Sequence, residues 1–263
     1  MEITFFKYQG AGNDFIIIDD REENFDRSNN DLIARMCDRR FGVGADGLML
    51  LRSKEGFDFE MVYYNADGRE GSMCGNGGRC IVSFAKRINV IGDKCCFVAV
   101  DGPHEAEVID HQGLNWISLK MIDVPDIEKG VGYVFMDTGS PHYVSFNSNN
   151  LENMNLIEEA KKIRYNQRFA KEGTNVNFID VNDNVLKIRT YERGVEDETL
   201  ACGTGVTAAV LTAHITGNIK GNEIDVKAKG GNLKVLFDKV GNGYQNIWLQ
   251  GPVEFVFKGL VND

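Results

Sequence analysis

The stretch Cys74-Gly75-Asn76-Gly77 occurs again, in altered form, as Cys202-Gly203-Thr204-Gly205, 128 positions later (202 − 74). Each copy follows a strand-like run and opens a run of small and apolar residues typical of a buried helix. We therefore expect one structural unit that occurs twice, with a cysteine at the N-terminus of each central helix. Two thiols in matching places favour proton exchange at a carbon centre, approached from both faces, over group transfer.

The repeat extends well beyond the two cysteines. Val98-x-Val100-Asp101-Gly102 corresponds to Val226-x-Ala228-Lys229-Gly230, again at an offset of 128 (230 − 102). Gly12-Asn13-Asp14-Phe15 falls opposite Gly139-Ser140-Pro141-His142 at an offset of 127 (139 − 12). A nearly constant offset from end to end predicts two similar halves.

The fold class predicted is α+β, with two pseudo-symmetric halves, each a curved, mostly antiparallel β-sheet or barrel wrapped around a central helix. The first half is residues 1–120, with Cys74, and the second is residues 121–251, with Cys202. A C-terminal strand near 252–263 is expected to return to the first half. Helices are predicted over 29–39, 76–88, 152–164 and 204–216. Strands are predicted over 2–8, 14–19, 47–52, 57–64, 95–100, 105–109, 114–119, 132–137, 176–181, 186–191, 224–228, 233–237, 245–249 and 253–257.

Composition narrows the class of protein. The 263 residues are 43% hydrophobic and 26% charged, as in an ordinary soluble globular protein, and the net charge of −10 argues against a nucleic-acid partner. No apolar run approaches the roughly 18–20 residues of a membrane span, so no membrane partner is expected. The first residues lack the basic-then-apolar order of a signal peptide, which makes a cytoplasmic location the expectation.

The six cysteines are not spaced like a disulfide framework or a zinc site. No pair has Cys-x-x-Cys spacing, and the chain has only four histidines, so no metal is expected. Most cysteines outside disulfides are small buried hydrophobes. We expect that of four of them: Cys37, Cys80, Cys95 and Cys96.

A cysteine at a helix N-terminus is chemically distinct. The unpaired backbone N–H groups and the helix dipole lower the pKa of a thiol there, and glycines let an anion reach those N–H groups. Two such turns could hold one carboxylate while a thiolate removes the α-proton and a thiol returns one to the opposite face. No cofactor is required for that exchange. The simpler alternative is a tight turn with a buried thiol, but duplication of the turn argues against it.

At these residues the chain resembles the diaminopimelate epimerase family, whose members interconvert LL- and meso-2,6-diaminoheptanedioate without pyridoxal phosphate. The resemblance covers the whole chain. Its motifs are Gly10-Ala11-Gly12-Asn13-Asp14-Phe15, Gly44-Ala45-Asp46-Gly47, Tyr64-Asn65-Ala66-Asp67-Gly68, Cys74-Gly75-Asn76-Gly77-Gly78-Arg79-Cys80, Gly139-Ser140-Pro141-His142, Asn175-Val176-Asn177-Phe178, Glu192-Arg193-Gly194 and Ala201-Cys202-Gly203-Thr204-Gly205.

The resemblance implies a role for each matching residue. Cys74 and Cys202 match the catalytic thiols, and His142 and Glu192 match residues that tune their pKa values. The matches to the backbone donors for the reacting carboxylate are Gly75, Asn76, Gly203 and Thr204. The matches to ligands of the ammonium groups and the distal carboxylate are Asn13, Asn65, Asn175, Glu192 and Arg193. The resemblance further implies an isomerase of lysine and peptidoglycan precursor synthesis, with a small-molecule substrate and the option of a homodimer.

Three positions depart from the common family pattern. Some members have Gln where this chain has Gly47, and many have Asn where it has Ser140. The loop Val195-Glu196-Asp197-Glu198-Thr199 is one residue longer. The polar residues also have plainer explanations: an ion pair of Arg193 with Glu196 or Asp197, a loop position for His142, and turn formation by the asparagines.

Three other functions fit part of the pattern. A two-thiol epimerase of proline-type amino acids would share the fold, although Arg193 and the asparagines favour a substrate with a second amino-acid end. A cysteine hydrolase could pair one thiol with His142, but it would leave the second thiol unexplained. A redox sensor could join Cys74 and Cys202 in a disulfide.

Overall fold

A computed structural model describes residues 2–71, 73–111, 113–147 and 151–262. Its internal contacts divide the chain into two compact units. One comprises Met1–Leu119 with Gly251–Asp263, and the other comprises Lys120–Gln250. No helix in the described ranges is both long and apolar enough to cross a membrane.

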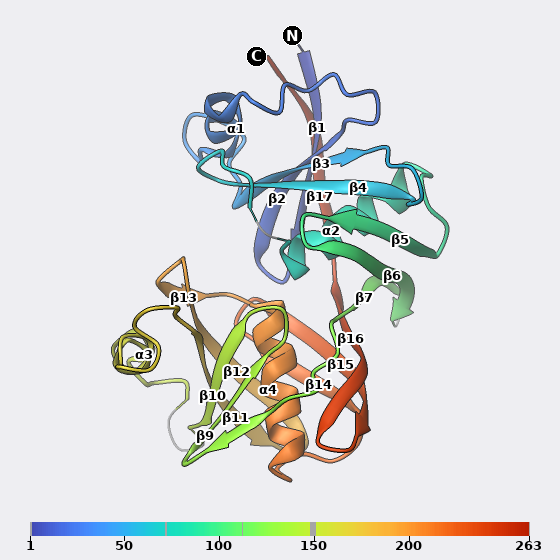
Figure 1. Ribbon diagram of the computed structural model, residues 1–263. Helices are drawn as coiled ribbons and strands as arrows, with labels where there is room; N and C mark the ends of the chain where they lie inside the picture. Colours follow the sequence, from blue (N-terminus) through green and yellow to red (C-terminus); the bar gives the residue numbers. More distant parts are fainter. Residues whose placement is uncertain (1, 72, 112, 148–150, 263) are drawn as a thin grey trace. The chain divides into compact units, whose positions relative to one another are not determined.

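The first unit is built on one mixed sheet (Figure 1). Its strands lie in the order β17-β1-β2-β3-β4-β5-β6-β7, with parallel pairs only at β2–β3 and β4–β5. Both chain ends lie side by side, because Glu2 of β1 pairs with Asn262 of β17. The strand bounds are β1 Glu2–Gly10, β2 Asn13–Asp19, β3 Gly47–Arg52, β4 Phe59–Asn65, β5 Lys94–Ala99, β6 Gly102–His111, β7 Leu114–Lys120 and β17 Glu254–Asn262.

Two helices cover opposite faces of this sheet. The first, α1 (Asn30–Cys37), begins at Asn29, whose side chain accepts a hydrogen bond from the backbone N–H of Leu32. Leu48 and Leu50 of β3 pack in the hydrophobic core with α1. The alternate residue Met49 lies against Gly77 at the start of the second helix, α2 (Gly75–Arg87). Strand β3 is buried along its whole length because both of its faces are covered.

The second unit repeats this plan. Its strands lie in the order β8-β9-β10-β11-β12-β14-β15-β16, with parallel pairs only at β10–β11 and β12–β14, and β13 pairs with β12. The bounds are β8 Glu128–Gly130, β9 Tyr133–Asp137, β10 Pro141–Phe146, β11 Asn175–Asn182, β12 Val185–Glu192, β13 Asp197–Thr199, β14 Glu223–Ala228, β15 Gly231–Val240 and β16 Gly243–Pro252.

The helices of the second unit occupy the corresponding connections. Helix α3 (Leu156–Arg164) follows β10 as α1 follows β2, and α4 (Gly203–Ile215) lies between β12 and β14, apart from short β13, as α2 lies between β4 and β5. Figure 1 shows α4 running through the curved sheet. Its residues from Gly205 to Ala213 are all buried. The predicted fold class, with its internal repeat and central helices, is therefore confirmed.

Candidate functional site

The two cysteines of the repeated turn occupy equivalent backbone positions. Cys74 precedes α2 with φ −106° and ψ 123°, and Cys202 precedes α4 with φ −115° and ψ 113°. Their carbonyls accept the first helical hydrogen bonds, from the N–H of Gly78 (2.7 Å) and of Val206 (2.8 Å). Both thiols are half-buried. The N–H groups of the first helical turn have no partners within the helix, so each turn can bind an anion beside its thiol.

The other four cysteines have different surroundings. Cys37, Cys80 and Cys95 are buried in the first unit, and burial raises the pKa of the Cys37 and Cys95 thiols to about 12. They are core residues, as expected. Cys96 was also expected in the core, but it is half-buried on β5 because it lies on the opposite face of the strand from Cys95. None of the six cysteines forms a disulfide.

In the second unit, a chain of hydrogen bonds leads to Cys202. The Oγ1 of Thr204 lies 3.4 Å from Cys202 Sγ and 2.9 Å from Nε2 of His142. On the other side of the ring, Nδ2 of Asn177 lies 3.0 Å from His142 Nδ1. The backbone explains this convergence, since His142 on β10 and Thr204 at the start of α4 both flank the buried strand β11.

The amide of Asn177 determines which groups donate and which accept in this series of hydrogen bonds. Its Oδ1 accepts from Thr190 Oγ1 (2.9 Å), and its Nδ2 donates to the carbonyl of Tyr143 (3.0 Å), which can only accept. Nδ2 must therefore donate to Nδ1 of His142, so the neutral ring carries its hydrogen on Nε2. His142 then donates to Thr204, whose own hydrogen points toward Cys202, an arrangement that favours the thiolate.

His142 is fully buried, and it stays neutral over the working pH range. Burial, with the positive charge of Arg193 adding to it, lowers the pKa of His142 to about 3. The imidazole is thus a hydrogen-bond donor to the Thr204 hydroxyl rather than a proton acceptor for a thiol. The loop position that we considered for His142 is wrong, because the residue lies within β10.

Asn175 connects the same region to the Glu192-Arg193 turn. Its Oδ1 accepts from the backbone N–H of Arg193 (2.8 Å), and its Nδ2 donates to Ser140 Oγ (2.5 Å) and to the carbonyl of Pro141 (3.2 Å). Ser140 thus holds the Asn175 amide in place. Burial of Glu192 raises the pKa of its carboxyl group.

Arg193 does not make the surface ion pair with Glu196 or Asp197 that was the plainer alternative to substrate binding. Its Nη1 donates to the carbonyl of Glu172 (2.9 Å), while Glu196 binds Arg164 (2.9 Å). No carboxylate in the described part of the chain pairs with Arg193, whose side chain is largely exposed. The guanidinium is therefore in place to bind a carboxylate from solution.

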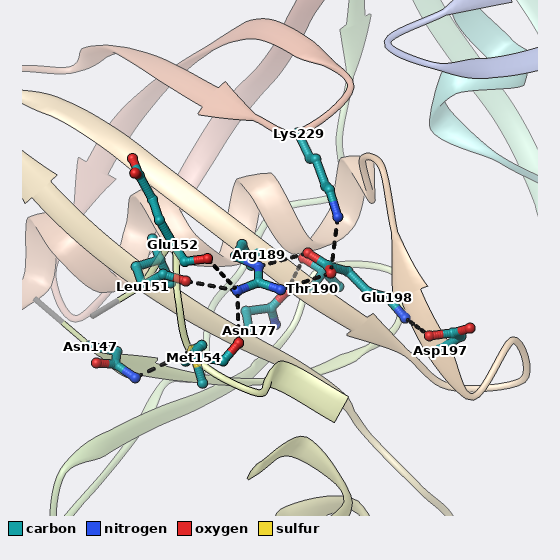
Figure 2. Close-up of polar contacts among 10 residues, drawn as sticks. All are labelled: Asn147, Leu151, Glu152, Met154, Asn177, Arg189, Thr190, Asp197, Glu198 and Lys229. Atoms are coloured by element: carbon teal, nitrogen blue, oxygen red, sulfur yellow. Dashed lines mark hydrogen bonds and ion pairs between the residues drawn. The ribbon is translucent and has the colours of Figure 1, made fainter. Parts of the chain in front are cut away.

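A second network fixes the strands that carry these residues (Figure 2). Arg189 on β12 donates through Nε and Nη2 to the carboxylate of Glu198 on β13, at 2.7 and 2.8 Å, and Lys229 binds the same carboxylate at 3.2 Å. Nη1 of Arg189 donates to the carbonyls of Leu151 and Met154. The network connects β12, β13 and the segment before α3. Glu198, its central carboxylate, lies four residues before Cys202 in the sequence.

In the first unit, asparagines gather at the start of α2. Ala11 and Gly12 both have positive φ, which makes a tight two-residue hairpin and starts β2 at Asn13. Asn76 Nδ2 then donates to Asn13 Oδ1 (2.5 Å), and Asn13 Nδ2 donates to Asp46 Oδ2 (3.0 Å). Asn65 is exposed at the end of β4, where its backbone closes the turn to Arg69. It is both a turn residue and an accessible amide.

The departure at Gly47 has a structural reason. A Cβ added there would lie 2.5 Å from the ring of Tyr63 and 2.5 Å from the carbonyl oxygen of Tyr64. The ring of Tyr63 also fills the space beside Gly71, where an added Cβ would lie 2.9 Å from it. Tyr63 occupies the place that a longer side chain at position 47 would need.

Sequence reasoning assigned no role to three residues of these networks. Asn177 lies in a quoted motif, and its spacing of two from Asn175 on a strand places both amides on one face. That spacing was a usable signal. Thr190 gave none, because a threonine in a strand carries no signal of its own. Arg79, whose Nη2 donates to Asn76 Oδ1 (2.7 Å) at the start of α2, belongs to the Cys74–Cys80 motif, but the motif did not indicate a role for it.

Comparison with known proteins places the chain among sequences of one family. The sequence model of the family described as diaminopimelate epimerase matches residues 5–121 and 134–256. A protein of that name from Flavobacterium psychrophilum is 48% identical over 260 residues, covering 98% of this chain and 100% of the relative. Another, from Chlorobaculum tepidum, is 43% identical over 261 residues, covering 96% and 98%.

Solved structures show the same fold at low sequence identity. A phenazine biosynthesis protein of the PhzF family from Bacillus anthracis has a TM-score of 0.76 at 13% identity and covers 100% of both chains. A hydroxyproline epimerase from Agrobacterium vitis has a TM-score of 0.69 at 14% identity, covering 99% of this chain and 92% of that one. At such low identities the similarity shows a shared fold and nothing about activity.

Proposed function

The chain belongs to the diaminopimelate epimerase family, and we propose that it interconverts LL- and meso-2,6-diaminoheptanedioate by a two-thiol mechanism. The observation that carries the proposal is the equivalence of Cys74 and Cys202. Both precede a 13-residue helix that is buried over most of its length, in units of the same strand order, with backbone angles that differ by no more than about 10°.

In the proposed reaction, one cysteine is a thiolate and the other a thiol. The thiolate takes the α-proton, so the C–H bond breaks as an S–H bond forms and its electron pair stays on the carbon. The other thiol then donates its proton to the opposite face and becomes the thiolate. Protons and electrons balance without an oxidant, and the two cysteines exchange roles in the reverse direction.

The carbanion must be stabilised by groups that are already in place. We propose that the N–H groups of Gly75 and Asn76, and of Gly203 and Thr204, hold the reacting carboxylate, because N–H groups of the first helical turn have no acceptor within the helix. Charge that develops on that carboxylate then meets fixed dipoles, which cost no reorganisation. The mechanism requires both turns to meet on one substrate.

The remaining polar residues select the substrate in this proposal. Arg193 binds the distal carboxylate as a planar fork, and Asn13, Asn65, Asn175 and Glu192 hold the ammonium groups. His142 tunes Cys202 through Thr204. We further propose a cytoplasmic enzyme of lysine and peptidoglycan precursor synthesis, with the option of a homodimer.

The direct test is α-proton exchange in deuterated water. Purified enzyme is incubated with LL-diaminopimelate, L-proline or trans-4-hydroxy-L-proline, and products are analysed by NMR and chiral chromatography. The proposal predicts deuterium at one α-carbon of diaminopimelate, together with formation of the meso isomer. Exchange with the proline substrates alone would assign the fold-sharing alternative, and the absence of exchange with all three amino acids would contradict the proposal.

A further inference from the structure

Arg79 is a buried cation that the proposed mechanism does not use. It lies on α2 five residues after Cys74, and its side chain has no exposed surface. Nη2 donates to Asn76 Oδ1 (2.7 Å) and Nη1 to the carbonyl of Gly75 (3.4 Å), while no described atom accepts from Nε. A fully buried guanidinium is rare unless an anion offsets its charge.

Its position on the helix adds to the cost. Arg79 lies near the N-terminus of α2, where the dipole favours anions and disfavours cations. The matching residue in the second unit is Thr207, 128 positions later, whose hydroxyl donates to the carbonyl of Gly203 (3.1 Å). A neutral side chain thus makes the same backward hydrogen bond in α4, so the charge at Arg79 serves another purpose.

No carboxylate in the described part of the chain lies within ion-pairing distance of Arg79. The titratable groups that interact with it are the thiols of Cys80 and Cys74, and negative charge on either would raise the pKa of Arg79 against the effect of burial. Cys80 is fully buried, and burial raises the pKa of its thiol well above the ordinary value. Cys80 therefore stays neutral, which leaves the half-buried Cys74.

We propose that Arg79 is a positioning residue whose buried charge is balanced by a thiolate at Cys74, so that Cys74 is the base of the substrate-free enzyme. The inference rests on the proposed function for its place in the reaction. In the first unit a cation supports the thiolate of Cys74, whereas in the second unit the neutral hydroxyl of Thr204 contacts Cys202.

The same guanidinium sets the direction of the neighbouring amides. Because Arg79 can only donate, Asn76 must turn its Oδ1 toward it and its Nδ2 toward Asn13. Asn13 in turn directs Nδ2 to Asp46. The polarity of two proposed substrate ligands therefore depends on Arg79.

The test measures thiolate formation directly and needs no turnover. Substrate-free full-length enzyme is alkylated with iodoacetamide from pH 5 to 9.5, and the rate at each cysteine is followed by peptide mass spectrometry. In the wild type we expect a lower midpoint for Cys74 than for Cys202. Arg79→Met should raise the Cys74 midpoint by about one pH unit or more, and Arg79→Lys should restore most of the difference.

Two controls make the result specific. Arg87→Met removes an equal charge from the exposed end of α2 and should leave the Cys74 midpoint unchanged, and Cys96 provides an internal reference. A folded Arg79→Met enzyme with an unchanged Cys74 midpoint overturns the proposal. If that variant does not fold, a wild-type Cys74 midpoint near the ordinary thiol value of about 8.5 overturns it instead. If the wild-type enzyme shows the expected midpoints but has no epimerase activity, only the proposed function is contradicted.

Discussion

The hydroxyl oxygen of Thr204 lies 3.4 Å from the sulfur of Cys202 and joins it to His142. This contact couples the reactive turn of the second unit to residues buried beneath it. A neutral imidazole donates to the hydroxyl, and the hydroxyl is left to donate to sulfur. The thiolate of Cys202 thereby gains a hydrogen bond without any charged neighbour on this path.

Removal of that hydroxyl should weaken Cys202 as a base. Thr204→Val keeps the shape of the side chain but loses a hydrogen bond to a charged group, a loss of about 1.5–3 kcal/mol, so kcat should fall roughly 10- to 100-fold. The alkylation midpoint of Cys202 should rise. Thr216→Val, at the far end of α4, is the matched control and should keep wild-type values for both.

Burial of His142 predicts a loss of stability in mild acid. The unfolded chain takes up a proton near pH 6.5, whereas the folded protein resists until the His142 pKa of about 3. The contribution of neutral His142 to the free energy of unfolding is fully present above pH 6.5, and it falls by about 1.4 kcal/mol per pH unit below that value. Urea unfolding at pH 7 and pH 5 should show a smaller difference for His142→Gln than for the wild type; equal differences would contradict this account.

The Arg189–Glu198 pair should stabilise the second unit. Arg189→Met leaves Glu198 partly buried beside Lys229 alone and removes donors from two carbonyls, so we expect a loss of about 3 kcal/mol in the free energy of unfolding. Lys187→Met removes a neighbouring exposed cation whose partner is Glu152, and it should change stability by less than about 1 kcal/mol. If Arg189→Met lowers the free energy of unfolding no more than Lys187→Met does, the Arg189–Glu198 network does not contribute specifically to stability.

Position 47 should tolerate no side chain. Gly47→Ala places a Cβ against the Tyr64 carbonyl, which is backbone and cannot rotate away, and we expect destabilisation of about 1–3 kcal/mol. Gly92→Ala is the matched control because an added Cβ there meets nothing within 4 Å. Thermal unfolding of both variants checks this, and a stable Gly47→Ala protein would remove the structural reason for glycine.

Much of the fold could be predicted from local sequence. Strand β3 and the four helices follow from apolar periodicity, capping residues and the repeat. Strand β10 was missed because Pro141 and His142 open it, and a proline usually argues against a strand. The three-residue strands β8 and β13 are too short for any periodic signal, and they form because neighbouring strands offer hydrogen bonds.

The residues that support the candidate site from behind, such as Asn177 and Tyr63, were less predictable than the cysteines. The cysteines and the glycines after them were identifiable because their backbone role is local. The role of Asn177 in orienting His142, and of Tyr63 in filling the space at Gly47, depends on neighbours from other strands. Such pairs become visible only when the register of the sheet is known.

The claim that both thiols act on one carbon is tested most directly by single substitutions. Cys74→Ala and Cys202→Ala are each assayed for conversion of LL-diaminopimelate to the meso isomer, with Cys96→Ala as the control. The account predicts that each of the first two variants loses epimerisation while remaining folded, and that the control keeps it. Full activity in either Cys74→Ala or Cys202→Ala would contradict the two-thiol mechanism.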